Sequence, residues 1–287
     1  MRNLLLLGAL LLAVAAPAHG QDKLKVVATF SILGNLTAEV GGEDVEVTSL
    51  VGPDADAHTY QPTPADVRTL ASSKVLVSNG LGFEGWIDRL AEAAAFTGAR
   101  IVASRNAPTQ GHDPHCWQDV ACARRYVANI GAGLAAADPA NAAFYRKRAS
   151  AYDVRLAALD SWVRSEIAKV PEDRRKAITG HNSFRYFAAA YGVQFQAPRG
   201  YSTDSSEPSA RDMANLIRQV REQKIRALFI ENMTNPVLVR EIAEDAGGVV
   251  GPRLYSDALS RPDGPAATYE ELMRHNVGAL VAGMQRN

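Results

Sequence analysis

Three histidines and one aspartate follow apolar runs at points where a strand should end or a helix should begin. His58 lies in DADAHTYQPTP, His115 in GHDPHCWQDV, His181 in ITGHNSF and Asp257 in RLYSDAL. Parallel α/β sheets bind ligands beyond the carboxyl ends of their strands, where these segments are expected. Three neutral imidazoles and one carboxylate suit tetrahedral Zn²⁺. Spacing alone does not establish a site, because the four residues are far apart in sequence and His58 by itself also fits a surface loop.

The remaining titratable residues near these segments have weaker claims to a metal. Glu231 follows the apolar run IRALFI. It either orients a liganding imidazole by accepting its second N–H, or is an ordinary glutamate at a strand end. His112 is expected to be exposed, and His275 to lie on the surface or in the packing of the last helix.

The chain has two cysteines, Cys116 and Cys122, which either form a disulfide or leave Cys116 as a soft metal ligand. In one continuous helix their Cα atoms would lie ~9 Å apart, beyond the ~7 Å limit for a disulfide. A disulfide therefore requires that Cys116 precede the helix.

The first twenty residues have the layout of a secretory signal peptide: Arg2, an apolar run over residues 4–16, and small residues up to Gly20. The apolar run is too short to span a membrane as a helix. His19 would leave with this leader, and no cysteine lies near its end to accept a lipid. We expect a free periplasmic protein with no membrane anchor.

Charge gives no sign of a polyanionic partner. The 31 basic and 31 acidic residues cancel, which argues against binding to nucleic acid or to an anionic membrane surface. Small-molecule and protein partners are favoured, and we expect a monomer.

The elements that would position these residues form two α/β lobes. Over residues 25–103, short apolar runs alternate with helical patterns, which predicts βαβ units and a parallel sheet. The alternation resumes after Pro171. Residues 139–170 favour one helix of ~45 Å that connects the lobes, although a helical hairpin within one domain is an alternative. The predicted division is a signal peptide (1–20), an N-terminal lobe (21–138), a linking helix (139–170) and a C-terminal lobe (171–287), with the metal site in the cleft between lobes.

Five ordered segments of the chain resemble one protein family from about Lys25 to the C-terminus. The segments are VVATFSILGNLTAEVGGEDVEVTSLVGPDADAHTYQPTPAD, DPHCWQD, ITGHNSFRYFAAAYGV, ENMTNPVLVREIAEDAGG and LYSDAL. They are similar to the zinc and manganese solute-binding proteins of ABC importers. The resemblance implies two α/β lobes joined by one long helix, and it assigns the metal ligands to His58, His115, His181 and Asp257.

The resemblance also bears on the choice of metal. Family members that resemble manganese carriers usually have a glutamate where this chain has His181, and imidazole favours Zn²⁺ where oxygen favours Mn²⁺. Three features depart from the common zinc pattern: the loop before His115 is short and poor in histidine, Cys116 replaces an aliphatic residue, and Gln61 replaces a frequent glutamate. They place the chain nearer the AztC-like branch, which lacks a long histidine-rich loop.

The resemblance implies a periplasmic protein that captures Zn²⁺ and delivers it to the membrane permease of an ABC importer, with a periplasmic metallochaperone as a further partner. A manganese carrier, a zinc chaperone or buffer without an importer, and an adhesin are the alternatives. An enzyme is not expected. Four protein ligands leave no open position for water, and HExxH, GxSxG and P-loop patterns are absent from the sequence.

Overall fold

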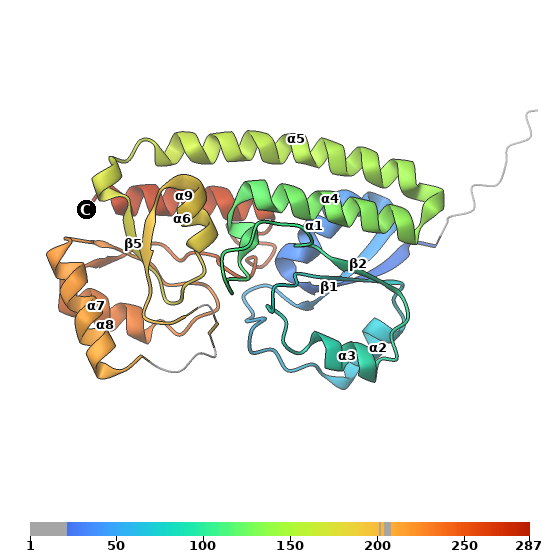
Figure 1. The fold of residues 1–287 in the computed structure, drawn as a ribbon, viewed down its shortest axis with the longest axis horizontal. Helices are drawn as coiled ribbons and strands as arrows, with labels where there is room; N and C mark the ends of the chain where they lie inside the picture. The colour runs from blue at the N-terminus through green and yellow to red at the C-terminus, as the bar shows by residue number, and fades with distance from the viewer. Residues whose placement is uncertain (1–21, 201, 204–207) are drawn as a thin grey trace, which may run out of the picture.

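The computed structural model describes residues 22–200, 202–203 and 208–287, and it has two α/β lobes connected by one long helix (Figure 1). The predicted signal peptide, residues 1–20, lies outside the described residues. Each lobe contains a four-stranded sheet in which every pairing is parallel. The predicted fold class is therefore confirmed.

The first lobe is built on the longer of the two sheets, with the strand order β2-β1-β3-β4. Its strands are β1 (Leu24–Phe30), β2 (Val45–Val51), β3 (Val75–Ser78) and β4 (Ala99–Val102). Its helices are α1 (Ser31–Gly41), α2 (Pro64–Ala71) and α3 (Ile87–Ala93), with a 3₁₀ turn at Gly42–Asp44. The central strand β1 is buried from Val26 onwards, as expected for a continuous apolar run between two parallel neighbours.

Helix α2 begins just after the segment that contains His58, and its start is fixed by local sequence. The Thr63 hydroxyl accepts from the backbone N–H of Asp66, and the Asp66 carboxylate accepts from the backbone N–H of Thr63. Pro64 occupies the first helical position, where its missing N–H costs nothing. The segment 52–63 therefore ends at a fixed point.

The second lobe has shorter strands, in the order β6-β5-β7-β8. They are β5 (Lys176–Ile178), β6 (Gln194–Gln196), β7 (Ala227–Leu228) and β8 (Val249–Val250). The helices of this lobe are α6 (Arg185–Tyr191), α7 (Ala210–Glu222), α8 (Val237–Ala246) and α9 (Tyr269–Met284), with a 3₁₀ turn at Glu172–Arg174. In β7, only two residues of the predicted strand IRALFIE pair as a regular strand.

Helices α4 (Val120–Ala137) and α5 (Ala142–Ile167) form the connection between lobes. They are separated by the 3₁₀ turn Pro139–Asn141, so α5 begins later than the predicted segment 139–170. Its 26 residues give a length of about 39 Å. Helix α5 packs along α4 and α1 and continues over α6 and α9, which places it across both lobes (Figure 1).

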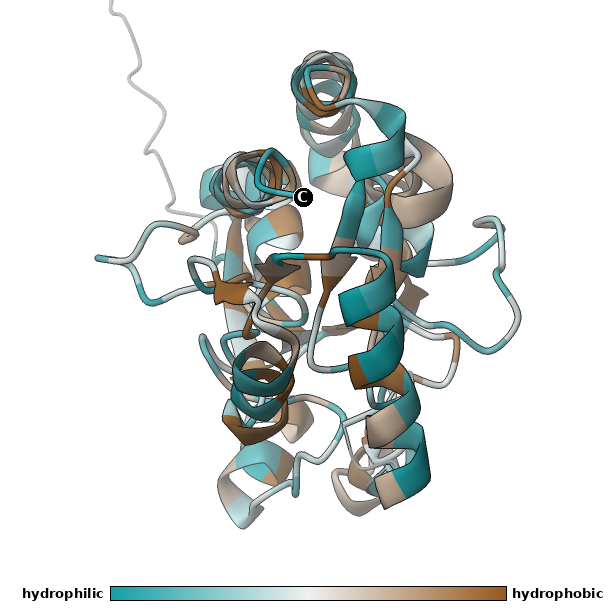
Figure 2. Cartoon of the chain, turned by 90° about the vertical axis from the view of Figure 1, so that its left-hand side faces the viewer, coloured by the Kyte–Doolittle hydropathy of each residue, from teal (hydrophilic) through white to brown (hydrophobic). Residues whose placement is uncertain are grey.

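The lobes share one large apolar core, and a smaller core lies under the outer helices of the second lobe. The smaller core consists of Ile178, Val220, Ile225, Leu228, Val239, Ile242 and Ala243. Figure 2 views the molecule from this end, where the helices carry both hydrophilic and hydrophobic stretches. No helix in the described residues is long and apolar enough to cross a membrane.

The last side chain of the sequence completes the second sheet. The Asn287 side-chain oxygen accepts from the backbone N–H groups of Arg226 and Ala227 at the start of β7. Its amide donates to the carbonyls of Arg174 and Lys176 at the start of β5. Asn287 therefore joins the amino ends of the two central strands.

Candidate metal centre

The four predicted ligands converge on one point between the lobes. One ligand atom from each of His58, His115, His181 and Asp257 lies within 4.8 Å of all the others. The Nε2 atoms of His58 and His115 are 3.2 Å apart. The Asp257 carboxylate lies 3.2 Å from Nε2 of His58, 3.5 Å from that of His115 and 3.1 Å from that of His181.

Three of the four ligands are supplied by segments beyond the carboxyl end of a strand. His58 lies between β2 and α2, and His181 lies three residues after β5. Asp257 follows Leu254, which forms an isolated parallel bridge with Glu231 beyond β7. His115 instead begins the 3₁₀ turn Cys116–Gln118 that leads into α4. Two ligands thus come from each lobe.

The imidazole of His115 is oriented by Asp113, a residue that the sequence analysis missed. Oδ1 of Asp113 lies 2.7 Å from Nδ1 of His115 and also accepts from the His115 backbone N–H at 2.9 Å. Both side chains are fully buried. The Asp-Pro-His spacing in DPHCW is the signal that could have indicated this contact, because a carboxylate two residues before a histidine can reach both its ring and its backbone N–H.

Glu231 has the corresponding position beside His181. Its Oε2 lies 2.7 Å from Nδ1 of His181. The same carboxylate accepts from the backbone N–H groups of Gly180 and His181 and from the hydroxyl of Ser183. Such a carboxylate fixes the imidazole tautomer and presents Nε2 to a cation. Glu231 therefore holds the turn that carries His181 as well as the ring itself.

The buried charges in the site shift one another's pKa values. Burial opposes the charged form of both His115 and His181, but Asp257 and the partner carboxylates Asp113 and Glu231 raise the pKa of each imidazole, that of His181 well above its ordinary value. Burial also opposes ionisation of Asp257, yet the facing imidazoles lower its pKa well below the ordinary value. The imidazoles and the carboxylates of the site therefore favour one another's charged forms.

The donor set fits a four-coordinate divalent cation. Neither carboxylate oxygen of Asp257 has a hydrogen-bond donor among the described residues, although both are fully buried. Zn²⁺ bonds of ~2.05 Å in a tetrahedron place neighbouring ligand atoms about 3.3 Å apart. His58–His115 and the three contacts of Asp257 have spacings of 3.1 to 3.5 Å, and all four ligands offer atoms within 4.8 Å of one another. A buried carboxylate that has no hydrogen-bond donor and faces three imidazole nitrogens is stabilised by a bound cation.

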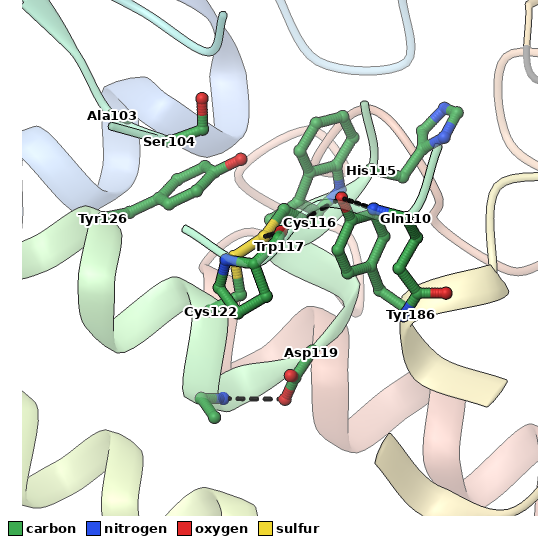
Figure 3. Close-up of a disulfide and its surroundings, with 12 residues drawn as sticks. Ala103, Ser104, Gln110, His115, Cys116, Trp117, Asp119, Cys122, Tyr126 and Tyr186 are labelled. Carbon is green, nitrogen blue, oxygen red and sulfur yellow. Dashed lines mark hydrogen bonds between the residues drawn. A yellow bond between two sulfur atoms is a disulfide. The ribbon is translucent and has the colours of Figure 1, made fainter. Parts of the chain in front are cut away.

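A disulfide follows the second imidazole directly. Cys116 and Cys122 are bonded, with their Cα atoms 5.8 Å apart (Figure 3). The approach is short because Cys116 lies in the 3₁₀ turn and Cys122 in the first turn of α4, and Asp119 caps that helix between them. Of the two alternatives that the sequence left open, the structure shows the disulfide, and Cys116 is not a free thiol.

The other two histidines lie away from the four-residue group. His112 is exposed. Nε2 of His275 lies 2.8 Å from the carbonyl oxygen of Arg253, and its ring contacts Tyr255. Neither belongs to the cluster of possible ligands in the described part of the chain.

Comparison with known proteins agrees with the fold and identifies the family. The family described as "ZnuA: Zinc-uptake complex component A periplasmic" matches residues 26–283. The manganese-binding lipoprotein MntA of Halalkalibacterium halodurans is 31% identical over 271 residues, which cover 92% of this chain and 90% of that protein. The iron-binding protein YfeA of Yersinia pestis is 29% identical over 282 residues, covering 95% of this chain and 90% of YfeA.

Solved structures give the same result. The periplasmic zinc-binding protein TroA from Treponema pallidum superimposes with a TM-score of 0.86 at 29% identity, covering 92% of this chain and all of TroA. A Mn-bound periplasmic metal-binding protein from Candidatus Liberibacter asiaticus has a TM-score of 0.84 at 29% identity, covering 91% of this chain and 99% of that one. The chain therefore belongs to the ZnuA family of metal-binding solute-binding proteins, which bind divalent metals for ABC transporters and are not enzymes.

Proposed function

We propose that this protein captures Zn²⁺ in the periplasm and delivers it to the permease of an ABC importer. In this proposal, His58, His115, His181 and Asp257 are the ligands, and Glu231 and Asp113 orient two of them. The observation that supports the proposal is the set of three imidazole nitrogens that lie 3.1 to 3.5 Å from one buried carboxylate. The nitrogen-rich set favours zinc over manganese.

The proposed organisation follows the two lobes. A signal peptide (1–20) directs export, residues 21–138 and 171–287 form the lobes, and residues 139–170 link them. A monomer that receives zinc from a periplasmic metallochaperone and docks on the permease completes the proposal. Size-exclusion chromatography with light scattering checks the monomer, and mass spectrometry of the exported protein checks the cleavage.

Manganese is the second candidate, because several relatives carry manganese in their names, including MntA of Halalkalibacterium halodurans. Raw affinity does not decide between the metals, since Zn²⁺ binds more tightly than Mn²⁺ to most protein sites. The decisive comparison is with the variant His181→Glu, which replaces an imidazole by a second carboxylate. Chelator-stripped protein is titrated with each metal in competition with a chromophoric chelator.

We expect the ratio of zinc to manganese affinity to be at least about tenfold higher in the native protein than in His181→Glu, because imidazole is the softer ligand. X-ray absorption of the zinc-loaded protein should give four nitrogen or oxygen neighbours. An equal ratio in the two proteins, or six neighbours in the native one, contradicts the zinc assignment.

Delivery to an importer is tested in cells. Deleting the gene for this chain and deleting the partner permease should impair zinc-limited growth to the same extent, and the double deletion should be no worse. An additive defect indicates a chaperone or buffer that acts apart from the importer.

A further inference from the structure

We infer that Phe83 is a positioning and specificity-determining residue of the metal site. Its ring holds His58 and keeps water away from the cation, which favours four-coordinate Zn²⁺ over a cation that needs water ligands. This inference rests on the proposed cation site and adds to it a residue that donates no ligand atom.

The three imidazoles of the site are not supported in the same way. His115 has Asp113 at its Nδ1, and His181 has Glu231. Among the described residues, no carboxylate pairs with Nδ1 of His58. The nearest aromatic neighbour of its ring is Phe83, with ring centroids 4.6 Å apart and an edge-on interplanar angle of 73°. For His58, packing against a ring therefore takes the place of a hydrogen bond.

Phe83 belongs to an aromatic cluster on the first-lobe side of the site, formed by Phe30, Phe83 and Trp117. The three ring centroids are 4.9 to 5.0 Å apart. The ring centroid of His115 lies 6.0 Å from that of Phe83 and 5.3 Å from that of Trp117. Phe83 is 2% exposed. The cluster thus presents carbon atoms to two of the four ligands.

The loop that carries Phe83 is held by a buried carboxylate. Glu84 accepts from the hydroxyl of Thr29 at 2.5 Å and from the backbone N–H groups of Asn79 and Gly80 at 2.6 and 3.3 Å. The backbone has positive φ at Gly80, Leu81 and Gly82, so the loop has a shape that most residues resist. Burying a carboxylate is costly unless it is fully hydrogen-bonded, and here three donors fix the residue next to Phe83.

The same loop is joined to the segment of the second ligand. The Asn79 side chain donates to the carbonyl of Pro114, the residue before His115, at 3.0 Å, and it accepts from the hydroxyl of Tyr126. The position of Phe83 is therefore tied to both first-lobe ligands, to His58 through its ring and to His115 through Asn79.

The chemical consequence concerns coordination number. Zn²⁺ is satisfied by four ligands, whereas Mn²⁺ prefers six oxygen-rich ones and would need water to complete its shell in this site. A coordinated water must donate hydrogen bonds, and the hydrocarbon ring of Phe83 offers no oxygen or nitrogen acceptor for them. An apolar shell thus controls solvent access to a metal. Phe83 should therefore disfavour a bound cation, such as Mn²⁺, that completes its coordination shell with water.

The test uses Phe83→Ala and Phe83→Leu in the full chain. The matched control is Phe184→Leu, since Phe184 is an equally buried ring that packs on Phe187 and Phe195 in the second lobe. Each protein is stripped and loaded with Co²⁺, whose visible absorption is strong when four-coordinate and weak when water raises the number. The zinc-to-manganese affinity ratio and the melting temperature of the metal-free form are measured in parallel.

We expect Phe83→Ala to bind Co²⁺ with a much weaker visible absorption and to lower the zinc-to-manganese ratio at least about tenfold. Phe184→Leu should lower the melting temperature and leave the spectrum and the ratio unchanged. Native spectrum and ratio in a folded Phe83→Ala overturn the inference. If the alanine variant does not fold, Phe83→Leu decides in the same way. A native protein whose own cobalt spectrum is weak would instead contradict the proposed four-ligand site.

Discussion

The two lobes contribute equally to the site but hold their ligands by different means. In the first lobe, β1 and β2 have seven residues each, and the ligands are backed by an aromatic cluster and a disulfide. In the second lobe, the four strands β5 to β8 have two or three residues each. There, one carboxylate, Glu231, fixes the turn that carries His181.

This difference shows that a ligand can be fixed either by packing or by hydrogen bonds. The first lobe adds dense apolar contacts, which change little with pH, to the single buried pair of Asp113 and His115. The second lobe relies on a buried charge network whose members depend on one another, so the loss of one partner leaves the others unsatisfied. Perturbations of the two lobes should therefore differ in size and in pH dependence.

Replacing Asp257 by asparagine should break the site most completely. The Asp257 carboxylate lies within 3.5 Å of all three imidazoles, so its removal affects every other ligand. We expect Asp257→Asn to weaken zinc binding at least about 100-fold, more than the loss of an outer hydrogen bond does. Competition with a chromophoric chelator measures the affinity. Asp153→Asn, which removes only the partly exposed partner of Arg124, is the control and should bind normally. Equal binding by both variants would remove Asp257 from the site.

Asp113 and Glu231, the carboxylates that orient His115 and His181, allow a direct comparison of the two lobes. Glu231→Gln should reduce zinc affinity by about 100-fold and Asp113→Asn by about tenfold, the two ends of the range for such partners. The effect of Glu231 is larger because this residue also holds the backbone of Gly180 and His181. Isothermal titration under identical buffer conditions compares the two. A larger loss in Asp113→Asn would reverse the contrast drawn between the lobes.

The disulfide should matter more for stability than for binding. Changing both Cys116 and Cys122 to serine should lower the free energy of unfolding by about 2 kcal/mol, from the lost constraint on a short loop. Urea denaturation monitored by tryptophan fluorescence measures this. Zinc affinity should change less than in Asp113→Asn, because Asp113 still orients His115. A large loss of affinity with little loss of stability would show that the disulfide positions the ligand.

The expected pH dependence follows from the raised imidazole pKa values of His115 and His181. His115 and His181 have pKa values above the ordinary 6.5 in the folded, metal-free protein. Their protonation therefore stabilises the metal-free fold fully below pH 6.5, and this contribution is lost as the pH rises through the raised values. Zinc requires neutral imidazoles, so its affinity should rise over the same window by about tenfold per pH unit for each proton displaced.

Melting temperatures of the metal-free protein and zinc titrations between about pH 6 and pH 9 check both trends. The two curves should move in opposite directions. Glu231→Gln should lessen the pH effect, because Glu231 is the first of the charges that raise the pKa of His181. Parallel curves would mean that the imidazoles are already neutral in the empty site.

Much of the fold was predictable because its signals are local. The predicted division between residues 138 and 139 falls where α4 ends and the 3₁₀ turn before α5 begins, and Thr63, Pro64 and Asp66 are residue types that favour the helix start found there. The short extent of β7 was not predictable, since IRALFIE reads as one buried strand. Its outer residues leave the ladder, and Glu231 turns its side chain toward the site.

The candidate site was predictable in its ligands and less so in its surroundings. His58, His115, His181 and Asp257 stand in segments with recognisable neighbours, whereas Phe83 lies in an unremarkable loop, SNGLGFE. Its contact with His58 depends on the strand order that brings the end of β3 beside β1, and no spacing in the sequence encodes that distance. Asp113 was missed although it is close in sequence, because its role depends on the turn that it forms.

The hydrogen bonds of Asn287 have a consequence for the order of folding. The first sheet is complete once residue 102 is available, whereas β5 and β7 receive their final partners only from the last side chain of the sequence. The lobe that supplies His181 and Asp257 is thus finished last. A chain that has folded only its first lobe holds half of the coordination sphere, so tight capture of a cation must wait until the second lobe has folded.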